Sequence, residues 1–195
     1  MSKTSRITSE IDFDRDGKQV GFLRVPHSVH RSAYGWIPIP VASIRNGEGP
    51  RVLLMAGNHG DEYEGQVAHA SLLRSLRPED VRGRLIFLTS ANFPAADAGM
   101  RTSPIDEGNL NRSFPGDNDG GITAQIAWYI EHVLLPQCDY VFDLHSGGSS
   151  LMCIWLTSGE MRERQAAGRA CRLTPHARPS KLTPSNDGPG ELNAV

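Results

Sequence analysis

The stretch that decides the fold is Arg51-Val-Leu-Leu-Met-Ala56 followed by Gly57-Asn-His59-Gly-Asp-Glu62, an apolar run that ends in a polar turn. A short continuous apolar run bounded by glycine is typical of a buried strand. A second apolar run, Tyr140-Val-Phe-Asp-Leu144, ends at His145. Each run therefore predicts a buried strand that carries a metal-type ligand to its C-terminal edge.

His59, Glu62 and His145 offer two imidazoles and one carboxylate. Zinc bound by three such side chains keeps its fourth coordination position open for water, as catalytic zinc does and structural zinc does not. At helical spacing, the Cβ atoms of His59 and Glu62 lie about 5–6 Å apart on one face. The alternative is an acidic helix N-terminus that offsets the helix dipole. Because a second strand also ends in a histidine, we favour a site for one zinc ion.

Further polar residues accompany these motifs. Asp143 and His145 lie on the same side of a strand, so Asp143 is predicted to accept a hydrogen bond from the imidazole nitrogen that does not bind metal, rather than to cap a turn. Arg112 and its neighbour Asn111 lie in a long loop, with Arg101 upstream. A guanidinium group suits carboxylates and developing oxyanions. We therefore interpret these three loop residues as functional rather than simply solvated.

The hydrophobic pattern predicts an α/β fold. Strands are expected over 19–25, 36–44, 51–56, 84–89 and 139–145, and helices over 61–76 and 122–135. Pro38 and Pro40 predict an edge position for the second strand. The segment 91–121 shows no periodicity, which is typical of a loop that is either functional or disordered. This order of elements predicts a largely parallel or mixed sheet flanked by helices, with ligands beyond the carboxyl ends of its strands.

Three regions are expected along the chain. Residues 1–18 form a polar, loose N-terminal lead-in, and 19–156 form the catalytic domain. Residues 157–195 contain few large apolar side chains and several Arg, Pro and Gly, so we expect a poorly ordered tail. A helix over 159–172 is the one regular element that this tail could hold.

Composition excludes several classes of protein. The net charge of −2 gives no indication of a nucleic-acid or membrane-surface partner. No apolar run is long enough to cross a bilayer, and the first residues do not form a signal peptide. Three cysteines without a CxxC pair favour a reducing, cytoplasmic location. The sequence makes no prediction about oligomeric state.

Three motifs carry a family resemblance: GNHGDEYEG at 57–65, NLNRSFPG at 109–116 and DLHSGG at 143–148. In this order they resemble the succinylglutamate desuccinylase/aspartoacylase family, which is zinc carboxypeptidase-like, and most of all its N-α-acetyl-diaminobutyrate deacetylases. The resemblance implies that the ligands of zinc are His59, Glu62 and His145. It also implies that Asn111 and Arg112 hold a substrate carboxylate, while Arg101 polarises the scissile carbonyl.

The chain also departs from that family, whose members are longer and carry a general-base glutamate on a later strand. The only glutamates after His145 are Glu160, Glu163 and Glu191. The family-like sequence is expected to end near Met152, as in a C-terminally truncated member, and the remainder is either a fragment end or a frame-shifted tail. The resemblance implies a zinc-dependent hydrolase acting on a small N-acyl amino acid, such as N-acetyl-diaminobutyrate. The alternatives are a catalytically impaired zinc-binding remnant and a peptide-cleaving carboxypeptidase.

Overall fold

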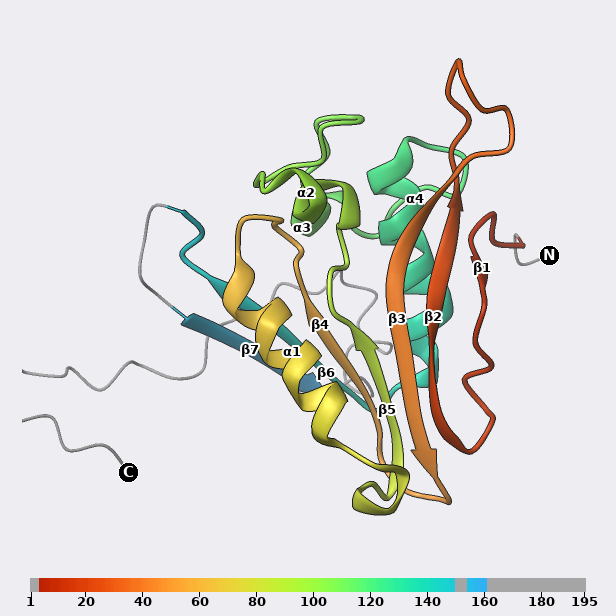
Figure 1. The fold of residues 1–195 in the computed structure, drawn as a ribbon, viewed down its shortest axis with the longest axis vertical. Coiled ribbons are helices and arrows are strands. Elements are labelled where there is room, and N and C mark those ends of the chain that lie inside the picture. The colour runs from red at the N-terminus through yellow and green to blue at the C-terminus, as the bar shows by residue number, and fades with distance from the viewer. Residues whose placement is uncertain (1–3, 150–153, 161–195) are drawn as a thin grey trace, which may run out of the picture.

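The structure, a computed structural model, describes residues 4–149 and 154–160. Its centre is a seven-stranded sheet in the order β1-β2-β3-β5-β4-β6-β7 (Figure 1). The strands are β1 (Thr8–Ser9), β2 (Gly17–Pro26), β3 (Trp36–Asn46), β4 (Arg51–Ala56), β5 (Gly83–Leu88), β6 (Tyr140–Ser146) and β7 (Ile154–Glu160). The helices are α1 (Tyr63–Ser75), η1 (Pro78–Asp80), α2 (Phe93–Ala98), α3 (Leu110–Ser113) and α4 (Ile122–Tyr129), which continues through η2 (Ile130–Leu134) into η3 (Leu135–Gln137).

The three central strands are parallel. β4 lies between β5 and β6, with Leu53 opposite Ile86 on one side and Val141 on the other. The remaining pairings are antiparallel, so the predicted helix-flanked sheet is confirmed in its mixed form. The carboxyl ends of parallel strands meet at one edge. The turn after β4 and the end of β6 are therefore brought together there.

Helices cover both faces of the sheet. The face under α4, η2 and η3 buries the larger apolar core, to which β2, β3, β4 and β5 all contribute. The face under α1 buries a smaller cluster around Ala42, Ile44, Val81 and Phe87. The periodicity of 122–135 predicts that one apolar face is formed by Ile122, Ile126, Tyr129, Ile130 and Val133. That prediction is confirmed, since the first four are buried and Val133 is half-buried. The periodicity of 61–76 predicts that one face is formed by Val67, Ala70, Ser71, Leu73 and Leu76. That prediction is wrong at Val67 and Ser71, which are exposed, and the buried residues of α1 are Gly65 and His69 instead.

The prediction that the proline-containing strand lies at an edge is wrong. β3 pairs with β2 along its length and with β5 over residues 41–46. The physical basis of that prediction nevertheless holds locally. Pro38 and Pro40 lie in the half of β3 that pairs with β2 alone. Because β5 does not extend to them, the N–H group that each proline lacks is not needed for pairing with β5.

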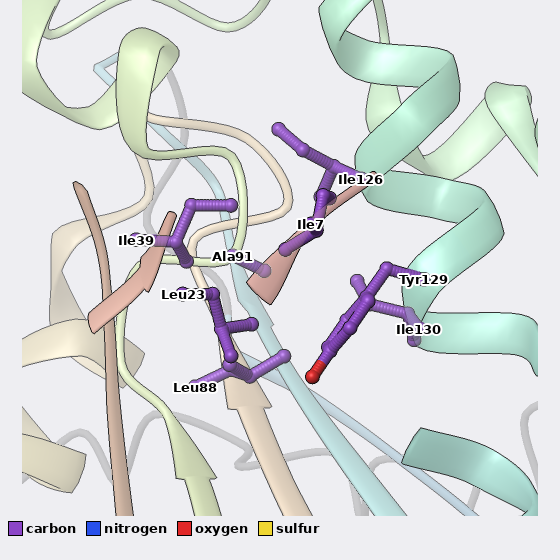
Figure 2. Close-up of a pocket in the computed structure, with 8 residues that line it drawn as sticks. All are labelled: Ile7, Leu23, Ile39, Leu88, Ala91, Ile126, Tyr129 and Ile130. Carbon is purple, nitrogen blue, oxygen red and sulfur yellow. The ribbon is translucent and has the colours of Figure 1, made fainter. Parts of the chain in front are cut away.

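The N-terminal segment is packed rather than loose. Ile7, Ile11 and Phe13 are buried in the core of the α4 face. Figure 2 shows Ile7 between α4 and the sheet, close to Leu23 and Ile126. The space among these side chains is too small to admit a water molecule, so this junction is packed core and not a binding pocket.

Two other segments differ from expectation. The loop 91–121 is not structureless, because it contains the short helices α2 and α3. Residues 157–160 of the expected tail belong to β7, antiparallel to β6, so a helix cannot begin at 159. The rest of that tail lies outside the described residues. Among the described residues, no helix is long and apolar enough to cross a membrane.

Candidate metal centre

The turn between β4 and α1 is held from two sides. Gly57 adopts a φ of +72°, which favours glycine and lets the chain reverse sharply after the strand. The N–H groups of Ala91 and Asn92 donate to the carbonyls of Ala56 and Gly57, at 2.8 and 2.9 Å. The turn is therefore fastened to the segment that follows β5, and residues 57–62 have a fixed course.

The side chain of Gln66, on the first turns of α1, fastens the same turn from the helix. Its amide group donates to the carbonyls of Gly60 and Glu62, each at 3.1 Å, and accepts the hydroxyl of Ser90 at 2.8 Å. Gly60 packs directly on α2: a Cβ there would lie 2.0 Å from the carbonyl carbon of Ala95. The position of the turn thus depends on a backbone approach that only glycine permits.

Three predicted metal ligands meet at this edge of the sheet. His59 and Glu62 come from the turn after β4, and His145 comes from the end of β6. His59 Nδ1 lies 2.7 Å from Glu62 Oε1, and His145 Nδ1 lies 2.9 Å from Glu62 Oε2. One possible ligand atom from each residue lies within 4.8 Å of the others. His59 and Glu62 are 3% and 4% exposed, so a group bound here would be largely shielded from solvent.

A second set of contacts lies behind the cluster. His145 Nε2 is 2.9 Å from Asp143 Oδ2, which is the contact predicted for these two residues on one strand. The same Asp143 oxygen accepts a hydrogen bond from the side-chain amide of Asn58. The backbone N–H of Ser146 donates to Glu62 Oε2 at 3.1 Å. The carboxylate of Glu62 therefore lies among His59 from the turn after β4 and His145 and Ser146 from β6.

Burial and hydrogen bonding oppose each other at these groups. Burial by itself raises the pKa of Glu62, but hydrogen bonds from His145, His59 and the Ser146 N–H outweigh it and hold that pKa well below its ordinary value. Burial by itself lowers the pKa of His145, but hydrogen bonds with Asp143 and Glu62 raise it. Both shifts have one cause, since buried carboxylates need a positive partner. A divalent cation would meet the same need, so the donor set fits a metal ion.

The loop arginines are placed differently from one another. Arg101 lies at the mouth of the cluster, with Nη1 3.6 Å from Glu62 Oε1, and its side chain is 54% exposed. Asn111 and Arg112 lie on α3 and are exposed. No described residue forms a salt bridge with Arg112 or a side-chain hydrogen bond with Asn111. The structure thus brings Arg101 to the cluster and leaves the other two open to solvent.

Among the described residues, the other histidines, His27, His30, His69 and His132, are not part of the cluster. His69 is buried in α1 with its ring edge-on to Phe87, and burial lowers its pKa. His132 is exposed and stacks on Trp128. Sequence reasoning did not identify Asn58, Gln66 or the Ser146 N–H, all of which touch the ligands or the turn that carries them. The one available signal was the position of Asn58 next to His59.

Comparison with known proteins gives a consistent family. Residues 48–183 match the model described as the succinylglutamate desuccinylase/aspartoacylase catalytic domain. The match continues beyond Met152, so the expectation that the family-like sequence ends there is wrong. The chain is 49% identical over 183 residues to the N-alpha-acetyl-L-2,4-diaminobutyric acid deacetylase of Halomonas elongata, covering 91% of this chain and 54% of that protein. A shorter similarity, 34% identity over 83 residues, covers 43% of the chain and 31% of murein peptide amidase A from Escherichia coli.

Solved structures give the same result. The product-bound ectoine utilization protein EutE (DoeB) from Ruegeria pomeroyi superposes with a TM-score of 0.73 at 52% identity, over 75% of this chain and 44% of that one. A succinylglutamate desuccinylase from a Silicibacter species also gives 0.73, at 50% identity, over 75% of this chain and 45% of that one. The chain therefore spans about half the length of the relatives it matches.

Proposed function

The chain belongs to the succinylglutamate desuccinylase/aspartoacylase family of hydrolytic enzymes, and we propose that it is a zinc-dependent hydrolase that cleaves the amide bond of a small N-acyl amino acid. N-α-acetyl-diaminobutyrate is the substrate we favour, because the Halomonas elongata relative is named as its deacetylase. The single observation that carries the proposal is the buried cluster of His59, Glu62 and His145 at the carboxyl ends of two parallel strands. A cytoplasmic location is part of the same proposal.

The donor set decides the choice of metal. Two imidazole nitrogens and one carboxylate suit zinc in a three-ligand site, whereas magnesium and calcium prefer sites made of oxygen atoms. Zinc, when bound, polarises a carbonyl oxygen and lowers the pKa of a bound water towards about 7. His59, Glu62 and His145 would hold it. Asp143 would keep the far nitrogen of His145 occupied, so that Nδ1 faces the metal.

We assign contacts with the substrate to Arg101 and to Asn111 and Arg112, the two exposed residues of α3. The guanidinium of Arg101 lies beside the cluster yet half in solvent, where it would stabilise the oxyanion that forms as the amide is attacked. Asn111 and Arg112 would hold the carboxylate of the amino-acid part, since a guanidinium binds a carboxylate through two parallel hydrogen bonds.

Glu160 does not fit the role of general base. It pairs with Tyr140 at the start of β6, whereas His145, near the end of that strand, pairs with Trp155. At about 3.4 Å per residue, the backbone of Glu160 is roughly 17 Å from that of His145 along the sheet. Glu163 and Glu191 lie outside the described residues. General acid–base assistance typically contributes about 10²–10⁴-fold, so turnover by this chain at ordinary enzyme rates would require Glu163 or Glu191 to act as the base.

Metal content tests the first half of the proposal. The purified chain should hold about one zinc ion, measured by elemental analysis after dialysis against a trace-metal buffer. His59→Ala and His145→Ala should lose most of it, whereas His132→Ala, which changes an exposed histidine on the far helix, should keep it. Full occupancy in the His59→Ala/His145→Ala double variant would refute the assignment of ligands.

Substrate comparison tests the second half. The zinc-loaded chain is incubated with N-α-acetyl-diaminobutyrate, N-succinyl-glutamate and a dipeptide, and release of free amine is followed. Faster release from an N-acyl amino acid supports the proposal. Faster release from the dipeptide would favour the peptide-cleaving alternative. The similarity to murein peptide amidase A supports that alternative. Zinc binding without any turnover would favour the catalytically impaired alternative.

Arg112→Ala gives a matched test of the carboxylate clamp. Loss of a charge-assisted hydrogen-bond pair costs about 1.5–3 kcal/mol, so KM should rise roughly 10–100-fold with a smaller change in kcat. Arg74→Ala, at an exposed arginine in the last turn of α1, is the control and should leave KM unchanged. An unchanged KM in Arg112→Ala would remove this residue from the substrate site.

A further inference from the structure

Asn58 lies beyond the C-terminal end of β4, and its side chain reaches Asp143 of the neighbouring strand β6. It is the residue before His59 in the turn after β4, and it is 1% exposed. Its amide nitrogen donates to Asp143 Oδ2 on the neighbouring strand β6. We propose that Asn58 is a positioning residue of the metal centre, which fixes Asp143 and through it the tautomer and orientation of His145. This inference rests on the proposed function, because it assigns a role in the same site.

The direction of each hydrogen bond follows from charge. An ionised carboxylate can only accept, so both partners of Asp143 Oδ2 must donate to it. The side chain of Asn58 therefore presents its NH₂ group and not its carbonyl oxygen. His145 likewise presents a protonated Nε2, 2.9 Å from the same oxygen. His145 Nδ1 is then the nitrogen left for a metal ion, on the side where Glu62 lies.

Burial makes this chain of contacts matter. Asp143 is 3% exposed, so water has little access to replace a lost donor. A hydrogen bond in such surroundings is electrostatically stronger than in water, and one that is lost is correspondingly costly. Groups that orient a metal-bound histidine typically change metal affinity about 10–100-fold when they are removed. Asn58 acts one bond further out than Asp143, so we expect the lower end of that range.

Asn58 also ties the two halves of the site together. Through the chain it adjoins His59, and through Asp143 it reaches His145. Any movement of the β4 turn relative to β6 must therefore change either its hydrogen bond or the separation of the two histidines. Met55 of β4, three residues before Asn58, lies opposite Asp143 in the parallel pair. The hydrogen bond from Asn58 to Asp143 therefore spans the end of that pair.

The test compares zinc affinity with stability. Asn58→Leu removes the donor with little change in volume, and Asn58→Asp replaces it by an acceptor of the same shape. Asn118→Leu is the matched control, since Asn118 is 5% exposed and makes two hydrogen bonds, with Thr4 and Arg6, remote from the metal ligands. Zinc affinity is measured by competition with a chromogenic chelator, at a temperature where circular dichroism shows each metal-free variant folded.

Both Asn58 variants should bind zinc about 10-fold more weakly, while the control loses stability and keeps its affinity. In a double-mutant cycle with Asp143→Asn, the losses should be non-additive, because Asn58 acts through Asp143. In the zinc-loaded protein, where Nδ1 would bind the metal, the ¹⁵N resonance of His145 Nε2 should shift in Asn58→Leu because its partner Asp143 is no longer held, and a merely structural role would leave it unchanged. If Asn58→Leu does not fold, Asn58→Asp carries the same comparison.

The outcomes separate this inference from the proposed function. Unchanged zinc affinity in both Asn58 variants, together with loss of zinc in His145→Ala, would overturn the role of Asn58 and leave the metal site intact. Additive losses in the cycle would also overturn it. Failure of the unmodified chain to bind zinc would overturn the proposed function, and this inference with it.

Discussion

Replacing Gly60 by alanine should damage both the stability of the protein and its affinity for zinc. A Cβ atom at this position would lie 2.0 Å from the carbonyl carbon of Ala95 and 2.1 Å from its oxygen, whereas ordinary contacts begin at 3.4 Å. Both contacts are with backbone, which cannot rotate out of the way as a side chain can. The turn and α2 must therefore separate by more than about 1 Å.

The magnitude follows from that displacement. Overpacking of this kind costs about 1–3 kcal/mol of the free energy of unfolding, and more where backbone must move. The turn that would move carries two of the three proposed ligands, and a metal site tolerates displacements of only about 0.5 Å. We therefore expect Gly60→Ala to weaken zinc binding roughly 10–100-fold in addition to its effect on stability.

Urea unfolding and chelator competition measure the two effects. Gly47→Ala is the control, because Gly47 has a φ of +63° but nothing within 4 Å of its would-be Cβ. It should cost about 1–2 kcal/mol through backbone strain alone and leave zinc affinity unchanged. If Gly60→Ala binds zinc as tightly as the unmodified chain and is no less stable, the close approach of the turn to α2 is refuted.

Three further predictions concern the rest of the fold. Arg84 is 4% exposed and donates to the carbonyls of Phe13 and Gln137. Arg84→Leu leaves these carbonyls without their donor, so it should lower the free energy of unfolding by at least about 1–3 kcal/mol. Urea titration measures this, and an unchanged free energy of unfolding would contradict it. Burial lowers the pKa of His69, so below about pH 6.5 the unfolded chain takes up a proton that the folded chain does not, and stability falls as the pH is lowered. With chelator present, His69→Gln should therefore show a shallower loss of stability between pH 7 and 5; equal slopes would argue against a buried neutral imidazole. Burial raises the pKa of the Cys138 thiol to about 11, so little thiolate forms at pH 8. A disulfide reagent should therefore modify this cysteine only after the protein unfolds, which peptide mass mapping would show. Rapid modification of the folded protein would refute the burial of Cys138.

Local sequence patterns were sufficient to predict the elements that bring the proposed metal ligands together. The apolar run 51–56 followed by glycine predicts a buried strand, and the structure has β4 there, parallel to β6. The pairing of His59 with Glu62 was predicted from helical spacing, but the structure forms it in the turn before α1, where the Glu62 N–H lies 3.4 Å from the carbonyl oxygen of His59. His145 could be added because parallel strands end at a common edge, a rule that needs no side-chain packing.

Other features could not be read from the sequence because they depend on distant parts of the chain. Ile7 lies in a polar stretch and becomes core only because α4 and the sheet leave a site for it (Figure 2). Val67 fits a helical apolar face yet is exposed, because the sheet meets α1 along the line of Gly65 and His69. The prolines of β3 predicted an edge strand. In the structure β5 pairs with residues 41–46 of β3 only, and the position at which β5 ends cannot be read from the sequence of β3.

What the sequence by itself indicated is therefore the three proposed metal ligands and the strand-to-turn units that carry them, since both arise from neighbours along the chain. Only the tertiary structure decided how those units are fixed. The bond from Asn58 to Asp143 joins residues of two different strands, and the contact between Gly60 and Ala95 joins a turn to α2. Such contacts exist only after the sheet has assembled, because packing, and not local propensity, sets the distance between segments that are far apart in sequence.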